Sequence, residues 1–295
     1  MLGEVLTAMV TPFHADGRIN FDRFRALARY LVDNGSDGLV VTGTTGESPT
    51  LSDHEKAQLW EAALDEVGER ATVIAGTGTN STQHTVELTE KAHKVGVDGL
   101  LVVTPYYNKP PQRGIVEHFR AVAAASDKPI IAYNIPGRCV INIEPATLVE
   151  IAEEIPTVRG VKQANADLDQ ARRIVAETNL ALYAGDDNLV LPFLELGGTG
   201  GVCVHTHLVG PQVKEMIRLF REGDTAGAKR INDELEPIYE LIGVVVGPIW
   251  VKTALNLLGQ DVGGYRLPMV EATPAETERA RACLERAGLL AAAPA

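Results

Sequence analysis

The residue in this sequence that is hardest to explain by packing alone is Lys162, which follows the apolar run 157–161. That run is typical of a short buried strand, so the ammonium group falls where the strand should end. A cation at the edge of a core is costly unless it is paired, reaches solvent or serves in chemistry. Partly desolvated lysines supply a neutral amine, which forms a Schiff base with a carbonyl substrate.

A lysine that forms an imine needs partners that move protons, because making and dehydrating the carbinolamine both transfer protons. Tyr133, Tyr107 and Thr44 follow or end predicted strands and could converge on the lysine as a relay. Arg138, or backbone N–H groups near Thr45, could hold a substrate carboxylate. The residues by themselves therefore favour a lysine-imine enzyme that acts on a small oxo acid.

Other polar groups have simpler explanations. His205 and His207 alternate along a strand end, but no third metal ligand stands out, so we interpret both as satisfied or solvated histidines. Asp186 and Asp187 are more typical of helix capping than of a Mg²⁺ site. We therefore expect no metal and no other cofactor.

Eight short apolar runs of strand length must position these groups. They are nearly continuous rather than alternating, as in parallel strands that are covered on both faces. Amphipathic stretches of helical period separate them, and Ser52 with Glu55 forms a capping box. The runs span residues 5–12, 38–43, 72–78, 99–105, 129–136, 158–163, 180–186 and 201–206.

Eight strand-then-helix units predict an α/β fold of the (β/α)₈ TIM-barrel type. A doubly wound sheet is the competitor, but the G-x-G at Gly76 and Gly78 lacks the third glycine of a dinucleotide fingerprint. After about residue 225 only helical patterns remain. We predict a catalytic barrel over residues 1–224 and a C-terminal helical domain over 225–295.

Composition limits the classes of partner. A formal net charge of −12 argues against nucleic acid, which would require a basic surface. Three widely spaced cysteines suggest neither a disulfide framework nor a zinc site. The N-terminal stretch does not resemble a signal peptide, and the apolar run 241–251 is too short to span a bilayer. We expect a cytoplasmic protein without a membrane partner.

Five motifs resemble those of the pyruvate-dependent class I aldolase superfamily of dihydrodipicolinate synthase and N-acetylneuraminate lyase: GTTGESPTLS, TPYYNKPPQ, YNIPGR, GVKQ and AGDD. The similarity covers essentially the whole chain and includes YRLPM before the last helix. The arginine of YNIPGR, with TPYYNKP, is most similar to the dihydrodipicolinate synthase branch. One departure is Gln163, which stands where an acidic residue is expected.

The resemblance implies a role for each site residue. Lys162 would form the imine with pyruvate, and Tyr133, Thr44 and Tyr107 would relay protons. Tyr107 would serve the neighbouring subunit of a homotetramer built as a dimer of dimers. The groups that would hold substrates are Thr45, the main chain at Val202, Gly185 in the pocket wall, and Arg138 for the second carboxylate.

The implied activity is condensation of pyruvate with L-aspartate 4-semialdehyde to 4-hydroxy-tetrahydrodipicolinate, a step of lysine biosynthesis through diaminopimelate. Two alternatives remain. A sibling aldolase would cleave sialic acid or a 2-keto-3-deoxy sugar acid, although Arg138 argues against a polyhydroxylated substrate. A non-catalytic paralogue would bind oxo acids, although the intact set of relay residues argues against it.

Some members of this family are inhibited by lysine, and the resemblance also implies where that pocket would lie. In inhibited members we expect a histidine at position 56 and a carboxylate at position 84, whereas this chain has Lys56 and His84. Because free lysine needs anionic partners, we predict weak or absent inhibition. The pocket residues would be Ser48, Pro49, Asp53, Lys56, Asn80, His84 and Tyr106.

Overall fold

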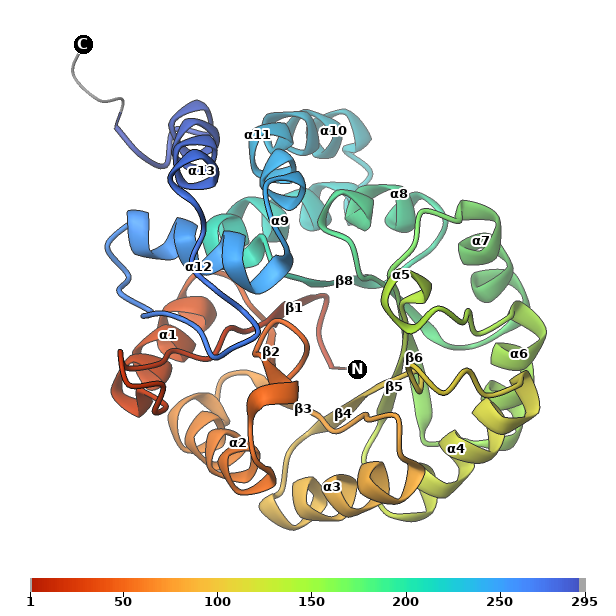
Figure 1. Ribbon diagram of the computed structural model, residues 1–295. Helices are drawn as coiled ribbons and strands as arrows, with labels where there is room; N and C mark the ends of the chain where they lie inside the picture. Colours follow the sequence, from red (N-terminus) through yellow and green to blue (C-terminus); the bar gives the residue numbers. More distant parts are fainter. Residues whose placement is uncertain (1, 292–295) are drawn as a thin grey trace.

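The computed structural model describes residues 2–291, and its centre is a closed barrel of eight parallel strands. The strands follow chain order, and β8 returns to pair with β1. Figure 1 looks down the barrel, with the strands at the centre and helices in a ring around them. The predicted (β/α)₈ fold is confirmed. The strands are β1 (Val5–Ala8), β2 (Gly38–Val41), β3 (Thr72–Gly76), β4 (Gly99–Val103), β5 (Ile130–Asn134), β6 (Val158–Gln163), β7 (Ala181–Ala184) and β8 (Gly200–Cys203).

Every strand is followed by at least one helix. The ring contains α1 (Phe21–Asp33), α2 (Asp53–Val67), α3 (Thr82–Val95), α4 (Gln112–Ala124), α6 (Pro145–Glu154), α7 (Leu168–Glu177), α8 (Val190–Glu195) and α9 (Thr206–Arg221). The single turn α5 (Pro136–Cys139) lies inside this ring, after β5 (Figure 1). Short 3₁₀ turns precede two of the ring helices, η1 (Ser48–Thr50) before α2 and η2 (Asp187–Leu189) before α8. The predicted capping box of Ser52 and Glu55 begins α2.

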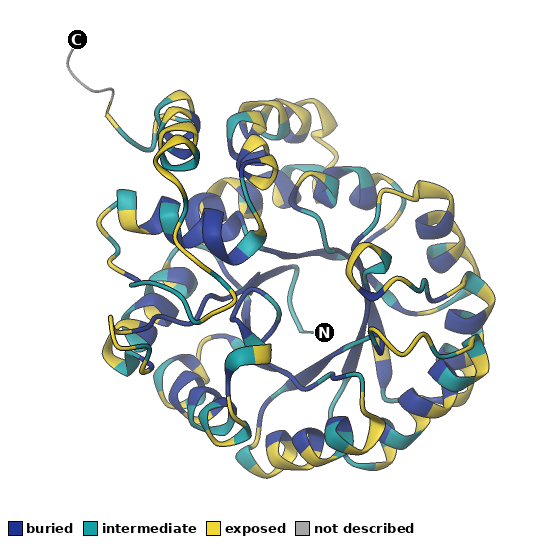
Figure 2. Cartoon of the chain, viewed as in Figure 1, coloured by how far each residue is buried: buried dark blue, intermediate teal, exposed yellow. Residues whose placement is uncertain are grey.

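The strands are buried on both faces, which explains their continuous apolar sequences. Figure 2 shows buried residues along the strands and on the helix faces turned toward them. Outward-facing strand residues pack against the helices in one large core. Inward-facing residues fill the barrel, as expected for this fold. They are Leu6, Ala8, Val40, Ile74, Leu101, Ile131, Tyr133, Ala164, Tyr183 and Val202.

The C-terminal part is helical, as expected, and lies against one side of the barrel (Figure 1). It contains α10 (Thr225–Glu234), α11 (Glu236–Tyr239), η3 (Glu240–Gly243), α12 (Gly247–Leu257) and α13 (Pro274–Arg286). Both α10 and α12 contact α9 of the barrel. The division of the chain into domains at residue 224 stays a prediction.

Within residues 2–291, no helix is both long enough and apolar enough to cross a membrane. Cys139, Cys203 and Cys283 are buried free thiols, in line with the expectation that they form no disulfide.

Candidate active site

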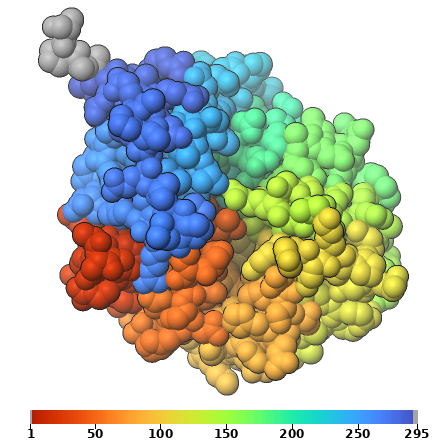
Figure 3. All heavy atoms as spheres, viewed as in Figure 1, coloured from red at the N-terminus to blue at the C-terminus, as the bar shows by residue number. Residues whose placement is uncertain are grey.

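The carboxyl ends of the strands surround a cavity of about 190 Å³, at the end of the barrel where enzymes of this fold carry their active sites. Figure 3 shows this face hollowed near its centre, between the light green α5 segment and the blue C-terminal segments. Barrel residues and residues of the C-terminal part both line the cavity. They are Thr44, Thr45, Tyr133, Ile135, Arg138, Lys162, Gly185, Asp186, Asp187, Val204, Ile242, Val246, Gly247, Pro248 and Trp250.

Lys162 is the penultimate residue of β6 and lines the cavity while being only 5% exposed. Tyr133 on β5 is its neighbour in register, and the Nζ atom of Lys162 lies 4.3 Å from the centre of the Tyr133 ring. No group in the described part of the chain accepts a hydrogen bond from this ammonium or forms an ion pair with it. A buried lysine without an anion is unusual in a purely structural role.

The loop after β2 brings Thr44 and Thr45 to the cavity through a constrained turn. Thr42 has a φ of 59°, and its hydroxyl donates to the Gly76 carbonyl at 3.2 Å and accepts from Trp60 Nε1 at 2.8 Å. A Cβ on Gly76 would lie 2.4 Å from the Thr42 carbonyl oxygen, so only glycine permits this approach. These contacts fix the start of the loop that carries both threonines.

Two further residues of the cavity wall are Arg138, which follows β5, and Gly185, which follows β7. Arg138 belongs to α5, is exposed at the rim, and has no ion-pair partner among residues 2–291. A Cβ on Gly185 would lie 2.6 Å from the Cβ of Ala164, so no side chain fits there. The guanidinium and the bare backbone are both open to a substrate.

Two predicted site residues do not line the cavity of the single chain. Tyr107 is 86% exposed and has a φ of 74°, an unusual conformation for an aromatic residue. Val202 is fully buried on β8, and its side chain packs inside the barrel. Val204, two residues later, lines the cavity instead.

The roof of the cavity was missed in the sequence. It comes from the run 241–251, which there indicated only an apolar segment too short for a bilayer. Ile242 and Val246 are exposed apolar residues in the turn before α12, and Trp250 on α12 is buried behind them. The sequence carried no signal for this roof, because the exposure of these apolar side chains is known only once the C-terminal part has folded over the barrel.

Asp186 also lines the cavity, although a helix cap was expected. Its side chain caps no helix and has no hydrogen-bond or ion-pair partner in the part of the chain that the structure describes. Burial raises the pKa of this half-buried carboxyl, while the charges of Lys162 and Arg138 oppose the rise and that of Asp187 adds to it.

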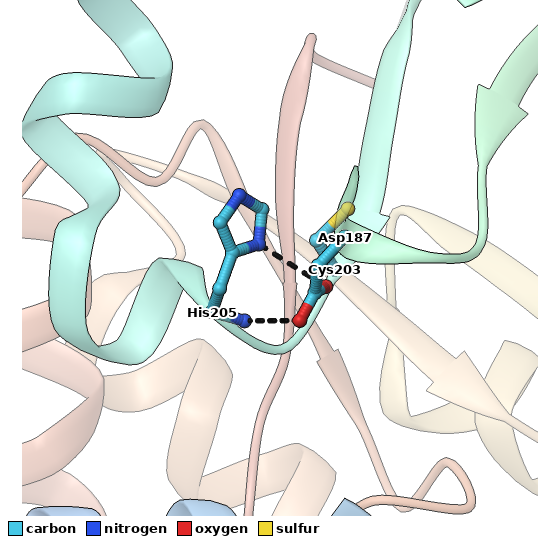
Figure 4. Close-up of side chains that lie close together, drawn as sticks. All are labelled: Asp187, Cys203 and His205. Atoms are coloured by element: carbon cyan, nitrogen blue, oxygen red, sulfur yellow. Dashed lines mark hydrogen bonds and ion pairs between the residues drawn. The ribbon is translucent and has the colours of Figure 1, made fainter. Parts of the chain in front are cut away.

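Asp187 does not cap the following helix either; it holds the turn after β8. Its two oxygens accept hydrogen bonds from the backbone N–H groups of Val204 at 2.8 Å and His205 at 3.0 Å. The Nδ1 atom of His205 also lies 3.1 Å from the carboxylate, as Figure 4 shows. The capping expectation is wrong because the carboxylate reaches a neighbouring strand end rather than its own helix.

Cys203 completes a buried trio whose ligating atoms lie within 4.8 Å of one another. Metals bind thiolates, but burial holds the pKa of the Cys203 thiol well above its usual range. Both oxygens of Asp187 are also engaged by backbone. This donor chemistry fits an Asp187–His205 pair better than a metal centre. His207 is satisfied, as expected, by Val204 and Val10, and burial lowers its pKa to about 4.

Gln163 points away from the cavity into a buried network of amide side chains. Asn134 Nδ2 donates to Gln163 Oε1 at 3.0 Å, and Gln163 Nε2 donates to Asn165 Oδ1 at 2.9 Å. A neutral amide can donate and accept in this network, whereas a carboxylate could only accept. The departure from the family pattern therefore lies outside the group that faces Lys162.

A second cavity of about 250 Å³ shares Thr44 and Tyr133 with the first. All seven residues named above for the lysine pocket line it. Lys56 is only 5% exposed and has no hydrogen-bond partner within the described residues, and burial lowers its pKa. The carboxylate of Asp53 is already engaged, by His84 Nε2 at 2.9 Å and by Lys91 at 3.2 Å.

Known proteins resemble the chain over nearly its full length. Residues 1–287 match the Dihydrodipicolinate synthetase family. The 4-hydroxy-tetrahydrodipicolinate synthase of Desulforamulus reducens is 49% identical over 291 residues, which is 98% of each chain. The solved structure of DHDPS from Cyanidioschyzon merolae with lysine bound has a TM-score of 0.96 at 43% identity, with 98% of this chain and 99% of that chain covered.

A second solved structure, of a monomeric dihydrodipicolinate synthase variant, has a TM-score of 0.95 at 37% identity and 98% coverage of each chain. The similarity is therefore one of sequence as well as of fold, since the family match covers residues 1–287 and includes the motifs at the cavity. The chain belongs to the dihydrodipicolinate synthetase family.

Proposed function

We propose that this chain acts as a 4-hydroxy-tetrahydrodipicolinate synthase, which condenses pyruvate with L-aspartate 4-semialdehyde. The observation that carries the proposal is the buried Lys162, which has no ion-pair partner among the described residues and lies in a cavity that also contains Tyr133, Thr44 and Arg138. The proposal is supported by relatives that are named for this activity and are 49% identical over 98% of this chain. A sugar-acid aldolase has less support, because a free guanidinium suits a carboxylate better than hydroxyl groups.

In this mechanism Lys162 attacks the carbonyl of pyruvate and forms an imine. Tyr133, in register beside Lys162, passes protons to and from the reacting carbon and nitrogen. Thr44 lines both cavities next to Tyr133 and extends the relay. Loss of a proton from the pyruvyl methyl group gives the enamine that attacks the semialdehyde carbonyl.

The carboxylates of the two substrates occupy different ends of the cavity. Thr45 in the cavity wall holds the carboxylate of pyruvate, and Gly185 leaves room for the growing chain. The role of the main chain at Val202 stays a prediction, because the side chain of that residue is buried inside the barrel. Arg138 at the rim binds the carboxylate of the semialdehyde, for which a planar guanidinium offers paired donors.

Tyr107 acts in the site of a second copy of the chain, within a homotetramer built as a dimer of dimers. Its exposure and its strained backbone support a role at a contact between copies. Sedimentation of the wild type and of Tyr107→Ala, with activity measured at each protein concentration, tests this assembly. The expected cytoplasmic location stays a prediction.

The experiment that tests the function offers purified protein pyruvate together with each candidate aldehyde. We expect a cyclic product with L-aspartate 4-semialdehyde, and no cleavage of sialic acid or of 2-keto-3-deoxy sugar acids. Arg138→Ala should impair use of the semialdehyde far more than imine formation with pyruvate. Equal loss of both would assign Arg138 to pyruvate or to structure.

A further inference from the structure

Asp186 is a carboxylate of the cavity to which no other group of residues 2–291 is bonded. It stands directly after Gly185 at the end of β7 and faces the same space as Lys162 and Arg138. Its neighbour Asp187 has both oxygens engaged by the backbone of the turn after β8. Within the described residues, the side chain of Asp186 has no such partner. The buried Asp187 has a structural role, whereas the half-buried Asp186 keeps its oxygens open to the cavity.

We propose that Asp186 binds the α-ammonium group of the second substrate and thereby selects an amino aldehyde acid over an aldehyde acid without the amine. This inference rests on the proposed function. The roles proposed above leave the α-ammonium group of L-aspartate 4-semialdehyde without a partner, and Asp186 would bind it.

The charges of the cavity support this assignment. L-aspartate 4-semialdehyde brings one carboxylate and one ammonium group, and Arg138 takes the carboxylate. Lys162 loses its charge as a free ammonium when it forms the imine, so its attraction for Asp186 changes at that point. An ammonium buried beside a guanidinium needs an anion close by. Asp187 is occupied, which leaves Asp186 as the free carboxylate on the cavity wall.

The same carboxylate can prepare ring closure. After the carbon–carbon bond has formed, the substrate nitrogen must lose a proton before it can attack the imine carbon. Asp186 accepts that proton, and its raised pKa makes it a better acceptor than an ordinary aspartate. The freed lone pair forms the new C–N bond, and the π electrons of the protonated imine move to the nitrogen of Lys162. A proton then passes from the ring nitrogen to the nitrogen of Lys162. The bond from the ring carbon to Lys162 breaks with its electron pair going to the lysine nitrogen, the lone pair of the ring nitrogen forms the ring C=N bond, and Lys162 leaves as the free amine.

The test compares two ligands that differ only in the amino group. Consumption of pyruvate gives the KM and kcat for L-aspartate 4-semialdehyde, and 4-oxobutanoate, the same chain without the amine, is titrated as a competitor. In Asp186→Asn, kcat/KM for the semialdehyde should fall roughly 10- to 100-fold, as for the loss of a hydrogen bond to a charged group. The inhibition constant of 4-oxobutanoate should change less than about threefold, within the scatter expected where no contact is lost.

Matched variants separate recognition from folding. Asp186→Glu keeps the charge and should recover part of the lost kcat/KM. Asp169→Asn removes an exposed carboxylate on α7 and should change neither kcat/KM for the semialdehyde nor the inhibition constant of 4-oxobutanoate. Arg138→Ala should weaken the binding of both ligands, because both carry the carboxylate.

Three results would overturn the inference while leaving the proposed function intact: an unchanged Asp186→Asn enzyme, equal weakening of both ligands, or loss of the borohydride-trapped pyruvate adduct in that variant. Wild-type protein that traps pyruvate on Lys162 but consumes no semialdehyde overturns the proposed function itself, and the inference with it.

Discussion

Two buried lysines border the loop that follows β2. Lys162 shares a cavity with Thr44 and Thr45 of that loop, while Lys252 on α12 contacts Glu47 at the end of the loop. Lys162 is 5% exposed and Lys252 is completely buried. The two positions are therefore comparable in burial and differ in their partners.

Lys252 is fully satisfied. Its Nζ atom donates to Glu47 Oε1 at 2.6 Å and to the Gly264 carbonyl at 2.7 Å, and it lies 4.4 Å from the centre of the Phe13 ring. Glu47 also accepts from the backbone N–H of Arg266 at 3.1 Å. These bonds join the C-terminal part of the chain to the loop that carries the two cavity threonines.

The difference teaches that burial does not by itself identify a reactive lysine. A buried lysine whose ammonium is bonded to a carboxylate and a carbonyl has its donors occupied, and it specifies how two parts of the chain fit together. A buried lysine that has an aromatic ring and an open cavity as its neighbours has its nitrogen accessible to the carbonyl of a substrate. The next four predictions test or refine this contrast, from the largest expected effect to the smallest.

Replacement of Lys162 should remove the chemistry entirely. In the wild type, incubation with pyruvate and borohydride followed by peptide mapping should place the reduced adduct on Lys162. Lys162→Ala should give no adduct and lose activity by roughly 10³-fold or more, because the covalent route is closed. An adduct on Lys252 or Lys109 of the wild type would break the comparison.

Replacement of Lys252 should cost stability rather than reactivity. Lys252→Met leaves Glu47 buried without its cation and should lower the free energy of unfolding by about 3–5 kcal/mol in urea titrations. The double variant Glu47→Gln/Lys252→Met should lose less than the single one, because no charge remains unpaired. A folded Lys252→Met protein that traps no pyruvate would contradict the purely structural role.

The junction around Lys252 should also respond to acid. Arg266 donates to Glu55 at 2.5 and 2.9 Å and lowers the pKa of Glu55 to about 2. The stabilisation that this pair provides is therefore complete above pH 4.5, the ordinary pKa of the group, and is lost as the pH falls toward 2. Because the pair is partly solvated, we expect about 1 kcal/mol.

Glu55→Gln keeps a capping residue at the start of α2 but removes the titration. Its free energy of unfolding, measured from pH 5 down to pH 2.5, should fall less steeply than that of the wild type. Parallel curves for the two proteins would show that the Arg266–Glu55 pair adds nothing to the junction.

A third buried lysine refines the comparison, and here the expected effect is close to zero. Lys56 lies on the second cavity without an ion-pair partner in the described part of the chain, and Asp53 is already bound by His84 and Lys91. Free lysine brings two ammonium groups to this cationic pocket, so it should inhibit weakly or not at all. Half-inhibition below about 1 mM, equivalent to roughly −4 kcal/mol, would contradict this prediction. Lys56→His/His84→Glu should gain sensitivity.

The barrel could be predicted because each of its strands has a recognisable local sequence pattern. Each of the eight strands is a short apolar run between helical patterns, and a parallel strand that is buried on both faces leaves this signature. Lys162 and Tyr133 could be placed in one cavity for the same reason, since both end strands of a closed barrel.

The features of the site that could not be predicted from the sequence depend on contacts between segments far apart in the chain or on the direction of single side chains. The roof formed by Ile242 and Val246 requires knowing how the C-terminal part folds back over the barrel. The partners of Asp187 and the freedom of Asp186 depend on which way two adjacent side chains point after β7. No periodic pattern encodes such directions in a turn.

Closure of the barrel between β1 and β8 has a consequence for synthesis. Val5 pairs with Gly201, so the first strand to leave the ribosome finds one of its two partners about 200 residues later. At ~5–20 residues per second, this wait lasts roughly 10–40 s. During that time one edge of β1 has no hydrogen-bonding partner, and the cavity cannot exist. The nascent chain is therefore most exposed to misassembly before its eighth strand emerges, and it gains its active site only when the barrel closes.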